Sequence, residues 1–431
     1  MIGSQISGFG LASWVFLQTH HIQDYANIGL AASLPMAILA PFVGVLVDRW
    51  HLRTSLLVAE GVGGLVSLVL FLTARFGHLA MWAIFACTLV QTAAIAFTWP
   101  ALSAITSVIV PKKHLARATA MLSFTDATAM LLGPTLGGIM LSAGLSGLLL
   151  ADLCSFIIAL GILNFFVKIP AIPRLPMREG KSSMMEEVWF SIRYVWDRPG
   201  LFRLLIFFLF SNSLRVLGKT LVAPLLLTLY PTALAGAIQG LEGVGIIAGT
   251  IGVVLLGAPR DRAKGTVRFN NFSAAMLFAM ALPPFPVFYS AAYFGMALFG
   301  NLGYTCNQSL WQAKIDPAIQ GRVFSIRRMI AQLGTPLALL MAGPLADRVF
   351  GPAMAPGGAL TPWLGGMFGD SAGAGVRVLV CLLGVFAAIN SWMVWRSSHV
   401  RNVETELPDF EPASYDRQAT ALYEDAIPAT D

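Results

Sequence analysis

Apolar residues recur along the chain in runs of about 20, separated by short polar stretches. Continuous runs of this length predict α-helices that cross a membrane, because about 20 helical residues span its hydrocarbon core. Lipid offers no partner to backbone N–H and C=O groups, which also favours helices. The pattern predicts about twelve membrane helices, near residues 1–19, 27–47, 54–74, 80–103, 118–142, 145–167, 203–229, 233–257, 269–286, 288–312, 321–345 and 375–396.

The composition supports lipid as the solvent. Hydrophobic residues make up 56% of 431 and charged residues only 12%, with a mean hydropathy of +0.72. A soluble domain has roughly a quarter charged residues. The sequence therefore predicts an all-α integral membrane protein with the lipid bilayer as a partner.

Basic residues lie almost entirely in every second connection between the predicted helices. By the positive-inside rule these connections face the cytoplasm, which predicts a multi-pass plasma-membrane protein with both termini inside. The net charge of +6 is then a topology signal, and nucleic acid is not an expected partner. The basic connections hold Arg49 and Arg53; Lys112, Lys113 and Arg117; residues 168–198; residues 260–268; Lys314 and Arg322; and Arg396 and Arg401.

The basic connections divide the chain into four parts. Residues 1–167 and 203–396 each hold six predicted helices, and residues 168–202 form a cytoplasmic linker. Within the linker, Trp189, Ile192 and Trp196 share one face, which predicts a helix in the membrane interface; a partner-binding helix is the alternative. Residues 397–431 form an acidic tail that we expect to be solvated and poorly ordered.

The first segment has unusual features. It starts at Met1 without a cationic flank, so it does not read as a signal peptide. Its 19 residues barely cross a hydrocarbon core of about 30 Å. The pattern thus favours a first helix that is truncated or has a misassigned start.

A six-residue pattern, G-x-x-x-D-R, repeats along the chain. It occurs at Gly44–Arg49 and Gly257–Arg262, each time between the second and third helices of a half. This predicts two pseudo-symmetric six-helix halves related by duplication, as in parallel-repeat transporters. A third match, Gly343–Arg348, falls on the extracellular side by the charge rule, and we interpret it as coincidence.

Longer motifs resemble the major facilitator superfamily. Residues 44–53 are similar to its G-x-L-x-D-R-x-G-R-[RK] loop, and residues 133–138 resemble the G-P-x-x-G-G element of its exporter branches. Residues 308–312 and 320–324 resemble a bacterial subgroup that contains enterobactin exporters and macrolide efflux pumps. The resemblance covers essentially the whole chain and implies a bacterial inner-membrane transporter.

The chain departs from that resemblance at two places. His51 and Leu52 stand where the family loop usually has Gly and Arg. Between Arg75 and Lys112 there is neither Arg nor Lys, although many drug–proton antiporters keep an Arg in the fourth helix. The usual coupling route of those antiporters is therefore not expected here.

The family loop implies a cytoplasmic gate centred on Asp48. A carboxylate there can pair with an Arg or face a helix N-terminus, and a turn residue beside topology charges is the alternative. Glu60 is a further gate partner by its position near the start of the third segment. The predicted gating residues are Gly44, Asp48, Arg49, Arg53, Glu60, Gly257, Asp261 and Arg262.

Ionisable groups at membrane depth are expensive and indicate function. Arg215 and Lys219 lie one helical turn apart, and Glu242 lies as far beyond the Tyr230-Pro231 connection as Lys219 lies before it. The spacing predicts a Lys219–Glu242 pair, either a proton-responsive site or a static ion pair. Asp126 is a second candidate for proton coupling, with a solvated helix-end carboxylate as the alternative.

Two further groups complete the predicted site. Small residues at helical spacing permit close helix approach, and mid-depth polar and aromatic groups can contact an amphipathic substrate or a neighbouring helix. The predicted packing residues are Gly133, Pro134, Gly137, Gly138, Gly245 and Gly249. The predicted substrate contacts are Gln91, Phe97, Trp99, Asn212, Asn301, Tyr304 and Asn307.

Other chemistry lacks a sequence signal. There is no G-x-S-x-G, H-E-x-x-H or C-x-x-C motif, so we expect no enzyme activity, metal or cofactor. The favoured function is export of an amphipathic drug, siderophore or secondary metabolite against protons, by a monomer with alternating access. The alternatives are an importer or uniporter of an organic anion, and a membrane sensor or scaffold that does not transport.

Overall fold

The computed structural model describes residues 2–49, 52–77, 79–110, 114–167, 184–257, 259, 261–282 and 285–410. The regular structure among these residues is helical, with no strand, which confirms the predicted all-α fold. The first half comprises α1 (Ile2–Thr19), α2 (Ile22–Arg49), α3 (Leu52–Arg75), α4 (Met81–Ile95), α5 (Thr98–Ile109), α6 (Leu115–Ala143) and α7 (Leu145–Phe165). The linker helix is α8 (Met184–Trp196).

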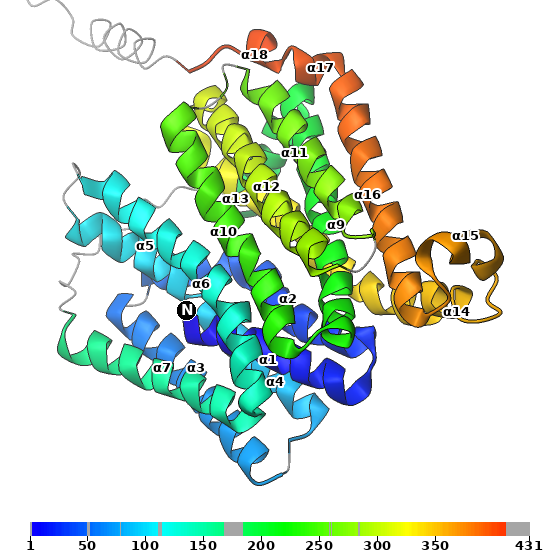
Figure 1. Cartoon of the computed structure of the whole chain (residues 1–431). Helices are drawn as coiled ribbons and strands as arrows, with labels where there is room; N and C mark the ends of the chain where they lie inside the picture. Colours follow the sequence, from blue (N-terminus) through cyan, green and yellow to red (C-terminus); the bar gives the residue numbers. More distant parts are fainter. Residues whose placement is uncertain are drawn as a thin grey trace, which may run out of the picture.

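The second half follows the linker and repeats the arrangement (Figure 1). Its long helices are α9 (Pro199–Leu229), α10 (Thr232–Leu256), α11 (Arg262–Ala279), α12 (Pro286–Lys314), α13 (Pro317–Gly343) and α16 (Ala372–Arg396). Between the last two lie the π-helix η2 (Pro344–Phe350), α14 (Gly351–Ala353) and α15 (Thr361–Phe368). Within the part of the chain that the structure describes, six helices are long and apolar enough to span a membrane: α3, α7, α9, α10, α16 and the α13–α14 stretch.

The fourth predicted segment is broken in two, contrary to the continuous helix expected over 80–103. The α4 helix ends at Ile95, and α5 begins at Thr98. The interruption has a local cause, because Pro100 has no N–H to donate to the carbonyl of Ala96 and its ring would collide with that carbonyl.

The ninth segment is displaced from its predicted range of 269–286. Its helix, α11, begins seven residues earlier, at Arg262, and ends at Ala279. Asp261 caps the N-terminus, since its side chain accepts a hydrogen bond of 3.0 Å from the backbone N–H of Lys264. The apolar run placed this helix too late because its first turns carry arginine and lysine.

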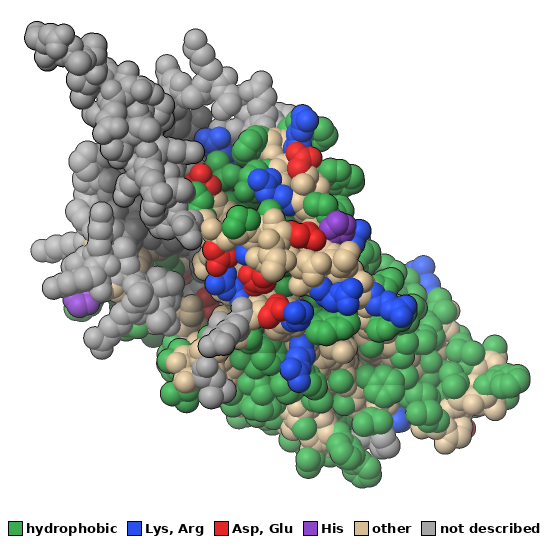
Figure 2. Space-filling model, turned by 90° about the horizontal axis from the view of Figure 1, so that it is seen from above, with side chains coloured by type: hydrophobic (Ala, Val, Ile, Leu, Met, Phe, Trp, Pro, Cys, Tyr) green, Lys and Arg blue, Asp and Glu red, His purple; other side chains and the backbone are tan. Residues whose placement is uncertain are grey.

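The two ends of the bundle differ in charge. We call the end with Arg53, Arg262, Lys314 and Arg396 the basic end, and the other, with His20 and Tyr230, the opposite end. Figure 2 views the molecule from above, where acidic and basic side chains gather over the second half among hydrophobic ones. Basic residues concentrated at one end of the bundle are typical of a protein that crosses a bilayer.

The two halves meet through two equivalent helix pairs. The α6 helix packs along α10, and α2 packs along α13. The α6–α10 contact is the most extensive one among the described residues, and at Gly236 it leaves no room for a side chain, because a methyl group there would overlap the carbonyl oxygen of Pro134. On α10 the close contacts run from Gly236 to Gly243, the part of the helix nearer the opposite end.

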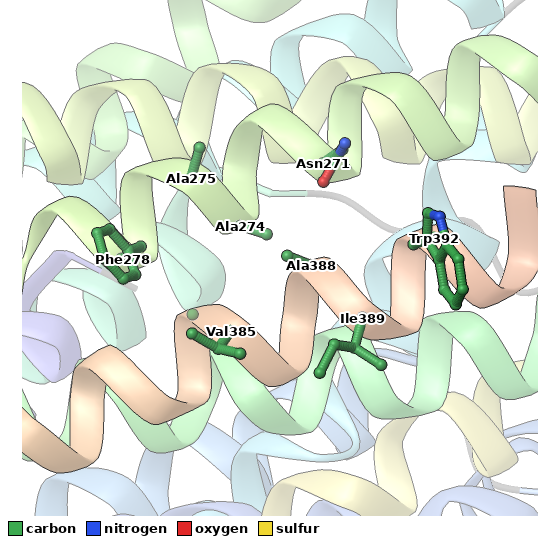
Figure 3. A pocket seen from close by; sticks show the side chains of 9 residues that line it. Asn271, Ala274, Ala275, Phe278, Val385, Ala388, Ile389 and Trp392 are labelled. Carbon is green, nitrogen blue, oxygen red and sulfur yellow. The ribbon is translucent and has the colours of Figure 1, made fainter.

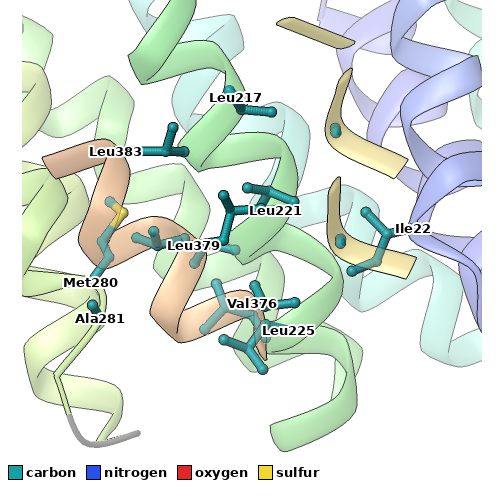
Figure 4. Packing of buried hydrophobic residues seen from close by; sticks show 14 of the residues in the cluster. Ile22, Leu217, Leu221, Leu225, Met280, Ala281, Val376, Leu379 and Leu383 are labelled. Carbon is teal, nitrogen blue, oxygen red and sulfur yellow. The ribbon is translucent and has the colours of Figure 1, made fainter. Parts of the chain in front are cut away.

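The second half has the larger buried core near the opposite end (Figure 4). Leu217, Leu221 and Leu225 project from α9 at intervals of four residues toward Val376 and Leu379 of α16. Ile22 of α2 joins the same cluster from the first half. The core therefore ties the halves together at this end.

A C-terminal strap, residues 398–410, crosses the basic end of the second half. It includes α17 (Ser398–Arg401) and α18 (Val403–Glu406), and buries Val400 and Val403 against the bundle. Our expectation of a solvated tail is wrong for this part, and residues 411–431 lie outside the described residues. Hydrophobic burial within an acidic stretch explains the difference.

Buried Lys314 holds the strap in place. Only 2% of its side chain is exposed, and its Nζ lies 3.2 Å from Glu404 Oε2 and 2.9 Å from Asp409 Oδ1. It also donates hydrogen bonds to the backbone carbonyls of Glu404 and Leu407. Burial alone would raise the pKa of Asp409, but the hydrogen bond and charge of Lys314, with Arg262, hold that pKa below its ordinary value.

The strap gives a stability prediction. Deleting 411–431 should leave the thermal unfolding midpoint in detergent unchanged, whereas deleting 398–431 should lower it, because Lys314 loses its ion-pair partners and the burial of Val400 and Val403 is lost. A carboxyl with a depressed pKa contributes stability that is lost only as pH falls through that low value, so the midpoint should not fall between about pH 8 and 5 through Asp409. Equal midpoints for both truncations would contradict this account.

Candidate functional site

An ion pair lies within the membrane-spanning part, formed by Lys219 on α9 and Glu242 on α10. Lys219 Nζ lies 2.6 Å from Oε1 and 2.6 Å from Oε2 of Glu242. The two-residue connection Tyr230-Pro231 brings both side chains to the same depth, so the ion pair predicted from spacing is present. About a third of the lysine and a fifth of the glutamate side chain remain exposed, which leaves the pair accessible to a small ligand or proton.

Arg215 extends this pair by one helical turn toward the basic end. Its guanidinium donates a short hydrogen bond to Asn212 Oδ1 and abuts Gly300 on α12. Arg215 and Glu242 also interact electrostatically. This part of the α9–α10 pair thus holds two cations and one carboxylate, an excess of one positive charge.

Asp126 lies elsewhere along the contact between the halves. It is half-buried on α6, next to Ala127, whose carbonyl a methyl group on Gly243 of α10 would contact. Glu242 instead turns toward α9. The two candidate coupling carboxylates therefore lie on helices that touch, but they do not form one cluster in this structure.

The first family loop is described only in part. The α2 backbone continues to Arg49, but the surroundings of Gly44 and the side chains of Asp48 and Arg49 are not among those described. Arg53 is exposed and donates to the carbonyl and side-chain oxygens of Asn164, at 3.1 and 3.4 Å. The cytoplasmic gate centred on Asp48 stays a prediction.

The repeated motif in the second half has local partners. Gly257 ends α10 with a φ of +76°, a conformation that suits glycine. Asp261 caps α11 and pairs with Lys264 at 2.6 Å. Arg262 lies 3.3 Å from Asp409 of the strap. Among the described residues, the side-chain partners of Asp261 and Arg262 all lie in the second half and the strap.

The third G-x-x-x-D-R match, Gly343–Arg348, lies at a contact between the two halves. Asp347, just beyond α13, accepts hydrogen bonds from the backbone N–H groups of Ile22, at 3.3 Å, and Gln23, at 2.9 Å. It therefore caps the N-terminus of α2 across the boundary between the halves. Asp347 has this role because α2 and α13 pack side by side with the end of α13 next to the start of α2, and whether the six-residue match is more than coincidence stays open.

The predicted packing glycines lie on three different contacts. Gly133 and Gly137 face α1, and Gly138 faces α10, with Pro134 between them on α6. Gly245 and Gly249 face α12 and not α6. The glycines of α10 that meet α6 are instead Gly236, Gly240 and Gly243, which form a separate stripe at helical spacing.

Most predicted substrate contacts have partners within the protein. Asn301 bonds the Ile246 carbonyl and Thr250 on α10, while Asn307 accepts from Trp311 on its own helix. The Gln91 amide lies 3.5 Å from Ser67, and Asn212 binds Arg215 as described. Phe97 lies half-buried at the α4–α5 break, Tyr304 is 53% exposed, and the side chain of Trp99 is not among those described.

A buried carboxyl group, Asp152 on α7, was missed by the sequence reasoning. It is 1% exposed, and its Oδ2 accepts a hydrogen bond of 2.7 Å from Ser67 on α3. Its Oδ1 has no hydrogen-bond partner among the described atoms. An acid inside an apolar run is a signal that could have identified it.

Other features of the described residues do not suggest a cofactor. No group of three or more His, Cys, Asp or Glu side chains among them is placed to hold a metal ion. A groove of about 470 Å³ between α11 and α16 is lined by Asn271 and otherwise mainly by exposed apolar side chains such as Phe278, Ile389 and Trp392 (Figure 3). This apolar surface suits contact with lipid.

The comparisons with known proteins now identify the class. The model of the Major Facilitator Superfamily matches residues 1–339. The chain belongs to this superfamily and is a multi-pass membrane transporter, which confirms the resemblance seen in the sequence.

Individual relatives are more distant. Macrolide efflux protein A of Streptococcus pyogenes is 25% identical over 366 residues, which cover 81% of this chain and 87% of that protein. A protein of the same name from Enterococcus faecalis is 30% identical over 91 residues, 21% of this chain and 28% of that protein.

Solved structures show the same fold at low identity. A variant of the nucleoside transporter NupG has a TM-score of 0.66 and 10% identity, over 92% of this chain and 100% of that one. A D-xylose–proton symporter has a TM-score of 0.61 and 14% identity, over 92% of this chain and 95% of that one. A bacterial homologue of the human lysosomal transporter Spinster, in an inward-facing and occupied conformation, has a TM-score of 0.63 and 13% identity. That match covers 95% of this chain and 97% of that one.

Proposed function

We propose that this chain exports an amphipathic small molecule from the bacterial cytoplasm in exchange for protons. The basic end faces the cytoplasm in this proposal, as the positive-inside rule requires. The observation that carries it is the Lys219–Glu242 pair, an acid and a base in contact within the membrane and partly open to solvent. The similarity to macrolide efflux proteins supports export as the direction.

The pair offers a simple coupling chemistry. A proton that binds Glu242 neutralises the carboxylate, removes its attraction for Lys219 and leaves the site with two uncompensated cations. Loss of that proton restores the pair. Substrate and proton can then compete for one site, which is the basis of antiport. Asp126, next to the contact between the halves, is a second carboxylate that can respond to the same cycle.

Alternating access follows from the contacts between the halves. Asp347 and the α6–α10 glycines hold the halves together toward the opposite end. In the proposal this closes the extracellular side, and rocking of the halves about the site opens it. The Asp48 loop, with Arg53 and Glu60, would then form the corresponding closure at the cytoplasmic end.

A second candidate function is transport of an organic anion on the same fold, by import or uniport. The excess positive charge from Arg215 and Lys219 favours it. The two candidates differ in direction and in substrate charge, so one cellular experiment separates them.

The test is compound accumulation in energised bacteria that lack their own efflux pumps. Cells producing the protein should hold less of at least one macrolide, cationic dye or catecholate siderophore than cells producing Glu242→Gln, and a protonophore should remove the difference. Greater accumulation of lipophilic anions in producing cells would favour the second candidate. Equal accumulation of every compound in producing and vector-only cells would contradict both.

A further inference from the structure

Two buried tyrosines lie between the opposite end and the ion pair. Tyr289 and Tyr293 occupy successive turns of α12, and each is 1% exposed. Neither hydroxyl has a hydrogen-bond partner among the described atoms. A buried polar group without a partner typically costs about 1–3 kcal/mol, so such groups usually bind ordered water or a transient partner.

The charged and titratable neighbours of these tyrosines come from four other elements. Tyr293 interacts electrostatically with Glu242 of α10, Tyr25 of α2 and Tyr289. Tyr289 interacts with Tyr230, in the α9–α10 connection, and with Arg377 of α16. The polar groups therefore form a series from the opposite end to Glu242 within an otherwise apolar core.

The depths of these groups increase stepwise from the opposite end. Tyr289 and Tyr293 are three and seven residues beyond Pro286, the first residue of α12, and Glu242 is ten beyond Thr232, the first residue of α10. At 1.5 Å per residue they lie about 4.5, 10.5 and 15 Å from the helix ends on that side. The two intervals are about 6 and 4.5 Å along the helix axis, which one or two water molecules can bridge.

We propose that Tyr289 and Tyr293, with intervening water, form the route by which protons pass between the opposite end and Glu242. This inference rests on the proposed proton antiport and specifies its path. Each hydroxyl accepts a proton from the water on one side as it donates its own to the water on the other, so the phenol stays neutral. The transferred proton ends on Glu242, which becomes a carboxylic acid and releases Lys219.

Tyr25 gives this route a connection to the conformational cycle. It is half-buried on α2, the helix whose N-terminus Asp347 caps, and it packs against the same core as Tyr289 and Tyr293. A proton path inside the second half also lets protons arrive while the halves remain in contact at this end. Substrate and proton can therefore use different routes to one site.

The test compares Tyr293→Phe and Tyr289→Phe with the unmodified protein in inside-out vesicles. Each change removes one oxygen and keeps the ring, so thermal stability should be equal or higher. Substrate-triggered proton release should slow at least about tenfold, a barrier increase of about 1.4 kcal/mol. Substrate–substrate exchange without a pH gradient should keep its rate, because it needs no proton transfer along the route. Tyr194→Phe, on α8 and away from this core, is the matched control.

The outcomes are distinct. Proton release by Tyr293→Phe within about twofold of the unmodified rate would overturn the route. Loss of exchange together with proton release would also overturn it, because the hydroxyl would then serve substrate binding or folding. Absence of substrate-triggered proton release in the unmodified protein would instead contradict the proposed antiport itself.

Discussion

Glu242→Gln should abolish proton-coupled transport while leaving a folded protein. Glutamine keeps the size of the side chain but cannot take up and release a proton in the cycle. Lys219 then loses the carboxylate 2.6 Å away, and this should lower stability by roughly 1–3 kcal/mol, since both side chains are partly exposed. We expect substrate-triggered proton release to be lost and exchange of bound substrate to persist.

A double variant separates coupling from simple structural pairing. In Lys219→Met/Glu242→Gln neither charge of the pair remains, so Lys219 no longer leaves an unpaired ion at membrane depth and stability should recover in part, while Arg215 keeps its charge. If Glu242 carries the proton, coupled release should stay absent despite that recovery. Restoration of coupled transport in the double variant would show that the pair is a static ion pair, and would move attention to Asp126. Asp126→Asn is therefore measured alongside.

Asp347→Asn should shift the protein away from the conformation described here. The aspartate carboxylate accepts two backbone N–H groups of α2 across the boundary between the halves. Asparagine loses the negative charge that faces the helix N-terminus and offers only one acceptor oxygen. A loss of about 1–2 kcal/mol would raise the population open at this end roughly five- to thirtyfold.

Spin labels on the two halves can report this shift. Positions 147, at the start of α7, and 363, on α15, are suitable because Gly147 has open space and Trp363 is 86% exposed. The four native cysteines must first be replaced. Asp347→Asn should increase the fraction of long distances, whereas the control Asp370→Asn, in the exposed turn before α16, should not. Identical distance distributions for both variants would contradict a latch at Asp347.

The sequence predicts the twelve segments and the ion pair because local rules govern both. Membrane thickness sets the length of apolar runs, and a two-residue connection forces Lys219 and Glu242 to one depth. The break between α4 and α5 follows from the missing N–H of Pro100, and the early start of α11 follows from its cap, Asp261. Hydropathy does not register either effect.

Contacts between the halves could not be predicted in the same way. Asp347 and Gln23 are 324 residues apart, so their bond depends on how two finished domains dock. On α10, glycines occur on more than one face, and spacing alone does not tell which stripe meets α6. Asn301 and Asn307 look like cavity groups by depth, yet their amides bind the protein's own helices and side chains.

Proton movement in inside-out vesicles tests the central claim, exchange of substrate for protons at Glu242, most directly. The lumen is acidified, and macrolides, cationic dyes, catecholate siderophores and lipophilic anions are added outside. A membrane potential supplies about 2.3 kcal/mol per charge per 100 mV, enough to drive detectable exchange. The account predicts that at least one compound triggers proton release from the lumen, and that Glu242→Gln vesicles show none. Release that is equally fast in Glu242→Gln vesicles would contradict it.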